Sequence, residues 1–432
     1  MSSKVKTKFL KKRCGETQSF FFEKDNPKIL LYPLTTMKIV IPSYERHDSF
    51  LTLSHLEKLD CEIYLFIIEE EYDDYKKYED KCKIVFGPQG IGLMRNFITD
   101  YFDEGEVLVC MDDDIDHFYQ DLSIELPKAI EYLSQSNLGL MTFPPTNMHL
   151  DRTRGYKEGF YYGIGTFHIL KNHKEFQLRY NQGDDLQRSI YYLEKDGATI
   201  RNFNIYFKSK PMNGKWKPKG GFQRDIANYI NETNRLAYEY RNYICLKDKY
   251  IKHFDCKVGN LTLSKKNPLV VELGYFNDFD KLYGLFEKIK LRIKANRNNR
   301  LGFPCSRRGI FGLSRPRFKY KGYLEKSYES KKYPEIHQEL MRIGKIICPF
   351  SFNCIQVNHN TICPSHKDGN NVGDSLLVSF GDYEGCKIIV DKKEYDAKNK
   401  PIVFNGSQLE HYNTDDLVGT KYSLIFFTLP NR

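Results

Sequence analysis

The sequence predicts two domains of different class, an α/β domain followed by an all-β domain. Between residues 37 and 114, near-continuous apolar runs alternate with helical patterns, which is typical of a parallel sheet covered on both faces. After residue 353, apolar runs of strand length alternate with turn-forming residues, which is typical of a barrel or jelly roll. The length of 432 residues is sufficient for two or three domains with cores of their own.

The composition excludes an extensively disordered chain, because 41% of the residues are hydrophobic and 14% are aromatic. The eleven cysteines are scattered singly, without a C-x-x-C pair, which indicates thiols in a reducing compartment. The basic start of the sequence lacks the apolar segment of a secretory signal, and no apolar run is long enough to span a bilayer. We therefore expect a soluble intracellular protein of the cytoplasm or nucleus, with no membrane partner.

After a weakly patterned lead-in, residues 1–36, the α/β domain is expected to begin at Met37. Its expected strands are residues 38–44, 62–70, 83–87 and 106–111. A first helix is expected after Asp48, which would cap it, with apolar positions at Phe50, Leu51, Leu53, Leu56 and Leu59. A second is expected over residues 92–102, burying Leu93, Phe97, Ile98 and Tyr101.

The fourth expected strand ends on three carboxylates, Asp112, Asp113 and Asp114. In open α/β sheets ligands bind beyond the carboxyl ends of the strands. The spacing of Asp112 and Asp114 suits a divalent cation that also binds a nucleotide diphosphate. The alternative is an ordinary acidic turn after a strand.

The all-β domain contains a second candidate site, formed by His366, Asp368 and His411. Two histidines and one carboxylate on one face are the ligand set of a non-haem Fe(II) oxygenase. Lys421 leads the last alternating strand, where a cation could hold the distal carboxylate of 2-oxoglutarate. The alternative is a surface or turn histidine, because a His-x-Asp triplet is common by chance.

The segment VNHNTICPSHKDGNNVGDSLLVSFGDYEGCKIIV, a later HY and the closing GTKYSLIFF resemble the Fe(II)/2-oxoglutarate dioxygenases of the Tet/JBP type, which hydroxylate the 5-methyl group of pyrimidine bases. The resemblance covers roughly the last hundred residues. It implies a double-stranded β-helix, or jelly roll, over residues 336–432. It also implies Fe(II) on His366, Asp368 and His411, with 2-oxoglutarate bound by Asn358 and Lys421. The family usually has arginine at this last position, and lysine cannot make a bidentate contact.

The stretches IVIPSYERHD, YLFIIEEEY, GIGLMRNFI and VLVCMDDDID resemble GT-A glycosyltransferases, with MDDDI as the D-x-D motif, and in particular those associated with Tet/JBP oxygenases. The resemblance covers residues 37–240. It implies a Rossmann-like α/β GT-A domain over residues 37–260, Mn²⁺ or Mg²⁺ on Asp112 and Asp114, and a UDP-sugar donor. The residues that it places around the nucleotide sugar are Pro42, Ser43, Tyr44, Arg46, Glu69, Arg95, Asn96 and Asp113.

Asp184 and Asp185 fall where the same resemblance places a carboxylate that faces the acceptor. One of them is a candidate general base for the acceptor hydroxyl. The alternative is a pair of acidic residues at a helix N-terminus, where they favour the helix dipole without any chemistry.

Residues 261–335 are expected to connect the two domains. From Lys288 to Lys321 there are twelve Lys or Arg and no Asp or Glu, and since the net charge is +10, the rest of the chain is slightly acidic. The segment is either a solvated linker or a nucleic-acid groove with interleaved aromatic residues. The candidate contacts to DNA or RNA are Arg297, Arg300, Arg307, Arg308, Arg315 and Arg317.

Together these features predict a two-step enzyme that hydroxylates the 5-methyl group of thymine or 5-methylcytosine and then glycosylates the new hydroxyl. Two alternatives stay open. One is a hydroxylase-glycosyltransferase that acts on lysine in a collagen-like protein. The other is a non-catalytic nucleic-acid-binding module with decayed sites. The sequence leaves the base, the sugar, the stereochemistry and the oligomeric state undecided.

Overall fold

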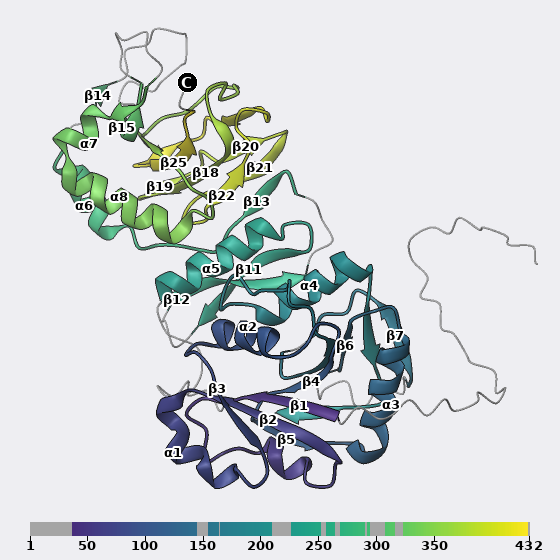
Figure 1. The fold of residues 1–432 in the computed structure, drawn as a ribbon. Helices are drawn as coiled ribbons and strands as arrows, with labels where there is room; N and C mark the ends of the chain where they lie inside the picture. Colours follow the sequence, from purple (N-terminus) through teal and green to yellow (C-terminus); the bar gives the residue numbers. More distant parts are fainter. Residues whose placement is uncertain are drawn as a thin grey trace, which may run out of the picture. The chain divides into compact units, whose positions relative to one another are not determined.

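The computed structural model describes residues 37–144, 154–163, 165–209, 226–251, 256–263, 268–289, 292–293, 307–315 and 323–430 (Figure 1). The expected lead-in, Arg297, Arg300 and Arg317 lie outside these residues. The chain divides into two compact units. Unit 1 takes its described residues from Met1–Pro88, Phe97–Phe176 and Tyr191–Pro211, and unit 2 from Gln89–Asn96, Gln177–Ile190 and Met212–Arg432.

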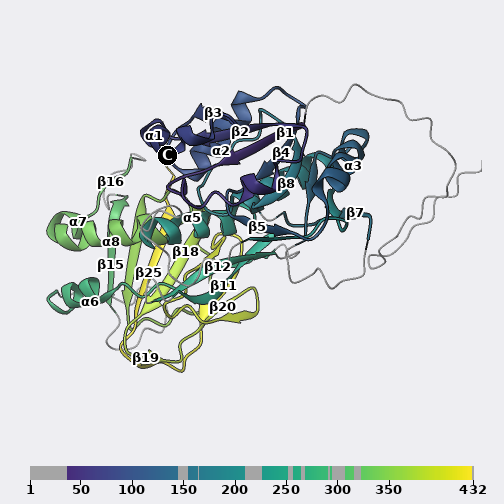
Figure 2. The same ribbon diagram turned by 90° about the horizontal axis from the view of Figure 1, so that it is seen from below.

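Unit 1 is built on an eight-stranded sheet with the order β3-β2-β1-β4-β8-β6-β9-β7. Figure 2 labels β3, β2, β1, β4, β8 and β7 of this sheet. A two-stranded sheet pairs β5 with β10. The strands are β1 (Met37–Pro42), β2 (Cys61–Ile67), β3 (Lys83–Phe86), β4 (Val107–Met111), β5 (Ile115–Phe118), β6 (Leu140–Thr142), β7 (Tyr156–Gly159), β8 (Phe167–Lys171), β9 (Thr199–Asn202) and β10 (Phe207–Ser209). The helices are η1 (Thr52–His55), η2 (Glu69–Glu71), α1 (Tyr72–Tyr75), η3 (Lys76–Tyr78) and α3 (Leu122–Gln135), while α2 (Ile91–Tyr101) and α4 (Asp184–Asp196) are divided between the units.

The expectation of a parallel sheet is only partly correct, because the sheet of unit 1 is mixed. β1 pairs in parallel with β2 and β4, and β2 with β3. β8 returns between β4 and β6 and runs antiparallel to both. The start of β8 therefore lies beside the carboxyl end of β4, where the backbone N–H of Asp112 bonds the carbonyl of Thr166 at 2.8 Å.

The two helices expected in this part differ from the structure. Only the 3-10 turn η1 forms after Phe50, and Asp48 does not cap it. In α2, Leu93 and Tyr101 are exposed, whereas Met94 and Ile98, four residues apart, are buried. The buried face of α2 is thus shifted by one residue from the face that hydrophobicity alone predicts.

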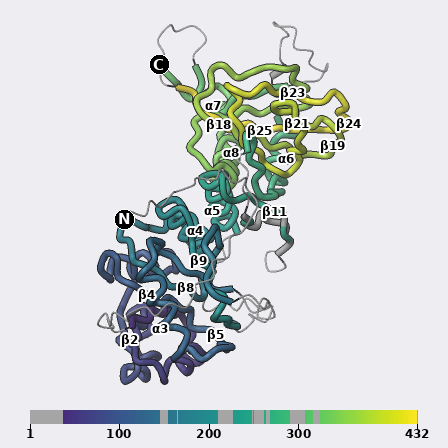
Figure 3. The backbone as a smooth tube through the Cα atoms, turned by 90° about the vertical axis from the view of Figure 1, so that its right-hand side faces the viewer, coloured from purple at the N-terminus to yellow at the C-terminus, as the bar shows by residue number. Residues whose placement is uncertain are grey.

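Unit 2 contains a second eight-stranded sheet, in which β13-β22-β18-β25-β17-β15-β14 are neighbours and β16 pairs with β15. Smaller sheets join β11 to β12, β19 to β24, and β20 to both β21 and β23. Figure 3 labels β11, β19, β21, β23 and β24 along the backbone tube. The strands are β11 (Ile244–Ile251), β12 (Cys256–Leu263), β13 (Val270–Glu272), β14 (Arg292–Ile293), β15 (Arg307–Ser314), β16 (Glu325–Lys326), β17 (Cys354–His359), β18 (Val372–Phe380), β19 (Tyr383–Glu384), β20 (Ile388–Val390), β21 (Lys393–Tyr395), β22 (Ile402–Phe404), β23 (His411–Asn413), β24 (Val418–Gly419) and β25 (Tyr422–Thr428). The helices are α5 (Ile226–Glu239), α6 (Asp280–Glu287), α7 (Tyr328–Lys332) and α8 (Pro334–Ile347).

Residues 261–335 do not act only as a connection, because their described parts belong to the fold of unit 2. β13 and β15 are strands of the large sheet, and Leu282 and Phe286 of α6 lie in the same hydrophobic core as Phe311 of β15. Helix α5, expected within the first domain, also packs here: Asn231 and Asn234 donate to backbone carbonyls at the end of α8.

The large sheet of unit 2 has one apolar face and one face that lines a pocket. On β17, Ile355 and Val357 pack into the core with α6 and α8, while Gln356 and Asn358 between and after them line the pocket. Because successive side chains of a strand point to opposite faces of the sheet, one face of β17 contributes to the core and the other to the pocket. Among the described residues, no helix is both long and apolar enough to cross a membrane.

Candidate functional site

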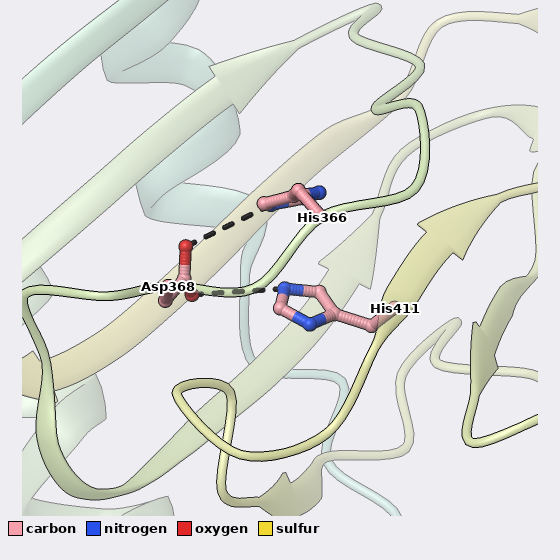
Figure 4. A group of neighbouring side chains, drawn as sticks. All are labelled: His366, Asp368 and His411. Atoms are coloured by element: carbon pink, nitrogen blue, oxygen red, sulfur yellow. Dashed lines mark ion pairs between the residues drawn. The ribbon is translucent and has the colours of Figure 1, made fainter.

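The structure brings His366, Asp368 and His411 together in unit 2 (Figure 4). The Nε2 atom of His366 lies 3.7 Å from Oδ1 of Asp368, and Nε2 of His411 lies 3.6 Å from Oδ2. The ligand atoms of all three residues lie within 4.8 Å of one another. Among the described residues this is the one group of three or more His, Cys, Asp or Glu side chains that could hold a metal ion.

Hydrogen bonds fix which nitrogen of each histidine is available. Nδ1 of His366 lies 2.7 Å from the carbonyl oxygen of Pro364, and Nδ1 of His411 lies 3.0 Å from that of Leu409. A carbonyl only accepts, so each Nδ1 carries the proton and donates. Each Nε2 then presents a lone pair toward Asp368, which is the tautomer that a metal-binding histidine requires.

Backbone hydrogen bonds explain why His366 and His411, which are 45 positions apart in the chain, lie side by side. His366 and His411 exchange both backbone hydrogen bonds, at 3.1 and 3.0 Å. The N–H of Asp368 bonds the carbonyl of Gly406 at 2.8 Å. The amide of Asn371 donates to Oδ2 of Asp368 at 3.3 Å, so the carboxylate is oriented from outside the ligand set as well.

Gly406 provides the space for the Asp368 carboxylate. A Cβ atom at this position would lie 3.0 Å from Oδ2 of Asp368 and 3.5 Å from Cε1 of His411. We expect Gly406→Ala to weaken the binding of a divalent metal ion about 10- to 100-fold, which is the loss that changes next to metal ligands typically cause. Gly369→Ala is the matched control, because a Cβ there meets nothing within 4 Å. Metal titration of both variants checks this, and equal affinities would contradict it.

Lys421 lies in the same pocket as the three candidate ligands. Lys421 is only 4% exposed, and its Nζ donates to the carbonyl oxygen of Cys386 at 2.5 Å. Within the described residues, no carboxylate forms an ion pair with this ammonium group. A buried cation is normally paired, so the pocket favours an anionic ligand at Lys421.

Other expected residues of unit 2 fall in or near this pocket. Asn358 is buried and lines it, with its Oδ1 accepting from Gln356 at 3.0 Å. Arg308, expected as a nucleic-acid contact, also lines the pocket, directly opposite Asn358 in the pairing of β15 with β17. Arg307 and Arg315 are half-buried at the start of β15 and just after its end.

A second group of expected residues lies in unit 1, at the carboxyl ends of β1 and β4. The Arg46 guanidinium bonds Asp113 and Asp114, both at 2.8 Å. Ser43 donates to Asp113 at 2.5 Å and also lies 2.6 Å from the hydroxyl of Tyr75. Burial raises the pKa of Asp113 to about 7, while Arg46 and Ser43 act in the opposite direction. Asp113 therefore organises this group from inside the fold.

The remaining residues expected in this group have different surroundings. Pro42 ends β1 and Tyr44 follows Ser43, whereas Glu69 is exposed in η2. Asp112 accepts at its carbonyl from Thr52, at 2.6 Å. The sequence reasoning missed Glu71, which accepts from the backbone N–H of Glu45 at 2.8 Å. Glu45 has a φ of +52°, so Glu71 stabilises a strained turn beside Arg46.

A third group lies in unit 2, where Arg95 of α2 meets Asp184 at the start of α4. Nε of Arg95 is 3.1 Å from Oδ2 of Asp184, and Nη1 of Arg188 is 4.0 Å from the same oxygen. Both arginine side chains are almost fully buried. The Asp184 carboxylate therefore has two buried guanidinium groups beside it. Arg188 was not identified as a site residue from the sequence. Its position four residues after Asp184 on a helix is the signal that could have identified it.

Asn96 and Asp185 form hydrogen bonds with nearby backbone groups. The Asn96 amide donates to the carbonyl of Leu178 at 3.0 Å and accepts from its N–H at 2.7 Å. Oδ1 of Asp185 accepts from the N–H of Leu186 at 2.8 Å, within the first turn of α4. The helix N-terminal interpretation of the Asp pair therefore has a direct counterpart in the structure.

Comparison with protein families gives a match in the first part of the chain. Residues 37–138 match the family described as TET-Associated Glycosyltransferase. The match begins at β1 and includes Ser43, Arg46, Asp113 and Asp114. Among curated proteins, none matches the chain by sequence.

Solved structures of two kinds are similar to parts of the chain. NgTET1 in complex with 5mC DNA is 11% identical, with a TM-score of 0.27, covering 38% of this chain and 72% of its own. A 2OG-Fe(II) oxygenase family protein from Burkholderia pseudomallei is 14% identical, with a TM-score of 0.26, covering 37% and 82%. The glycosyltransferase GlyE of Streptococcus pneumoniae is 14% identical, with a TM-score of 0.24, covering 48% and 50%.

Proposed function

We propose that the chain is a bifunctional enzyme of nucleic-acid base modification. One part hydroxylates the 5-methyl group of a pyrimidine, thymine or 5-methylcytosine, and the other transfers a sugar from a nucleotide sugar to the new hydroxyl. The observation that carries the proposal is the group of His366, Asp368 and His411, with both Nε2 atoms directed at one carboxylate. The match of residues 37–138 to a glycosyltransferase family supports the second activity.

The donor set of unit 2 fits Fe(II). Two neutral imidazoles and one carboxylate bind from one side, which leaves positions for a co-substrate and O2. Iron and 2-oxoglutarate, when bound, would activate O2, which is the oxidant for an unactivated C–H bond. His366 and His411 bind through Nε2, while their Nδ1–H bonds to backbone carbonyls keep the rings oriented.

Lys421 is proposed to bind the distal carboxylate of 2-oxoglutarate. We expect Lys421→Ala to weaken 2-oxoglutarate binding about 10- to 100-fold, because a buried hydrogen bond between charged groups contributes about 1.5–3 kcal/mol. Calorimetric titration of the metal-loaded protein checks this. Lys398→Ala is the control, since Lys398 contacts the same Tyr383 ring at 4.8 Å but is not a pocket residue. Unchanged binding in Lys421→Ala would remove the assigned role.

For sugar transfer, we propose that Asp112 and Asp114 bind Mn²⁺ or Mg²⁺ with the diphosphate of a UDP-sugar. Arg46 holds Asp114 in place through its 2.8 Å ion pair. Arg95 and Arg188, which both pair with Asp184, are proposed to approach the sugar or the phosphates of the donor. The proton of the acceptor hydroxyl passes to one of the carboxylates at the start of α4, Asp184 or Asp185.

The proposed substrate is DNA, and RNA is the alternative nucleic acid. The basic residues from Lys288 to Lys321 supply phosphate contacts, with Arg307, Arg308 and Arg315 on β15 or just after it. A methyl group in a duplex cannot reach an enclosed metal, so the base is expected to flip out of the stack.

The experiment measures 2-oxoglutarate decarboxylation by the full chain with Fe(II) and a panel of substrates. The panel contains thymine-only DNA, DNA with 5-methylcytosine, the matching RNAs and a collagen-like lysine peptide. Decarboxylation stimulated by DNA supports the proposal. Stimulation by the peptide alone would replace it with lysine hydroxylation, and stimulation by none, together with no bound iron, would indicate a non-catalytic module.

A further inference from the structure

The ammonium group of Lys421 has two close partners on one residue, Cys386. Nζ lies 2.5 Å from the carbonyl oxygen of Cys386 and 3.1 Å from its Sγ. Lys421 is 4% exposed and Cys386 is 1% exposed, and both line the pocket that contains the candidate iron ligands. The ring of Tyr383 lies beneath, with its centroid 5.3 Å from Nζ.

The backbone at Cys386 is in an uncommon conformation that the neighbouring turn holds in place. Cys386 has a φ of +48°, and Gly385 before it has a φ of +69°. The N–H of Cys386 donates to Oδ1 of Asp416 at 2.7 Å. A Cβ on Gly385 would lie 2.2 Å from the carbonyl oxygen of Asp416, so the turn is closely packed against that residue. A strained conformation that the surroundings fix in this way is typical of functional sites.

The number of N–H donors on Lys421 limits how many hydrogen bonds it can give to a ligand. A lysine ammonium has three N–H donors, and two of them are directed at the carbonyl and thiol of Cys386. One donor remains for a ligand in the pocket. An arginine at this position would bring a planar group with five donors, and the Cys386 thiol occupies space beside Nζ that such a group would need.

We propose that Cys386 is the positioning residue of Lys421, and that it makes lysine rather than arginine the working anchor for an acidic co-substrate in this pocket. The proposal rests on the proposed function of the pocket. The carbonyl oxygen and the thiol of Cys386 both contact the ammonium group of Lys421, so the role assigned to Cys386 acts through Lys421. Among the described cysteines, Cys348 differs from Cys386, because its thiol donates to the carbonyl of Phe350 and it does not line the pocket.

The test measures binding of 2-oxoglutarate to the full chain loaded with Mn(II), by calorimetry without O2. We expect Cys386→Ala to weaken binding about tenfold, since the ammonium loses one of its two fixing contacts. Cys386→Ser, which keeps an acceptor, is expected to stay within about twofold of the original protein. Cys348→Ala is the matched control, because Cys348 does not line the pocket, and this variant is expected to bind normally. Thermal unfolding of each variant separates loss of positioning from loss of folding.

The decisive comparison uses arginine at position 421. Lys421→Arg alone is expected to lose binding more than about tenfold, whereas adding Cys386→Ala is expected to restore part of it, because the thiol no longer obstructs the guanidinium. In steady state, Cys386→Ala is expected to raise the KM for 2-oxoglutarate and leave kcat nearly unchanged. Unchanged binding in Cys386→Ala, or additive losses in the double variant, would overturn the proposal. No binding to the original protein would instead overturn the proposed function of the pocket, and this inference with it.

Discussion

His366→Ala is expected to abolish hydroxylation and to leave sugar transfer intact. Removing a metal ligand should cost more than the 10- to 100-fold loss caused by changes outside the ligand set. His366 contributes to a candidate metal group formed within unit 2, whereas Arg46, Asp113 and Asp114 form a group of their own within unit 1. The measurement is sugar transfer from UDP-glucose to DNA that already contains hydroxymethylpyrimidine, beside hydroxylation of unmodified DNA.

Lys367→Ala is the matched control for His366→Ala. Lys367 lies between two candidate ligands in the chain but is exposed, so its replacement should leave both reactions unchanged. Loss of both reactions in a folded His366→Ala protein would contradict the assignment of two separate sites. Retained hydroxylation would contradict the assignment of His366 itself.

Asp114→Asn is expected to have the opposite effect, a loss of sugar transfer of about a hundredfold or more with hydroxylation retained. The change removes a proposed cation ligand, and metal stabilisation of a leaving diphosphate contributes several kcal/mol. It also removes the carboxylate that Arg46 holds at 2.8 Å, although Asp113 still pairs with the guanidinium.

Asp116→Asn is the control for this change, because Asp116 is an exposed residue of β5 two positions further along the chain. Both variants are assayed for sugar transfer and for hydroxylation. Dependence of the original protein on added Mn²⁺ or Mg²⁺ gives an independent check. Sugar transfer at the original rate in Asp114→Asn would remove this residue from the proposed cation site.

The residues of the candidate metal site could be picked out from the sequence because most of the determinants of their positions are local or periodic. His366 and Asp368 are two residues apart on a turn, and His411 leads a short strand, so pattern and spacing identify all three. The contacts that complete the site are not local. The role of Gly406 can be recognised only from the space that it leaves beside Asp368 in the folded chain. Cys386 contacts Lys421, although the two residues are 35 positions apart in the chain.

The fold was predicted correctly where apolar runs alone determine the secondary structure. The prediction failed where contacts between distant residues determine which face is buried or which strands pair. The strands from β1 to β4 fall at the expected places. The buried face of α2 includes Arg95, because its guanidinium meets Asp184, and hydrophobicity cannot indicate such a contact. The antiparallel return of β8 and the membership of α5 in unit 2 depend on distant pairing, which a local pattern does not encode.

The central claim is that one chain performs two consecutive reactions on a pyrimidine base. The most direct test incubates the protein with thymine-only DNA and with 5-methylcytosine-containing DNA, in the presence of Fe(II) and 2-oxoglutarate. UDP-glucose is added to half of the samples, and the digested nucleosides are analysed by mass spectrometry. We predict a gain of one oxygen in both halves and a further hexose only where the sugar donor is present. Unchanged nucleosides in every sample, from protein that binds Fe(II) and 2-oxoglutarate, would contradict the claim.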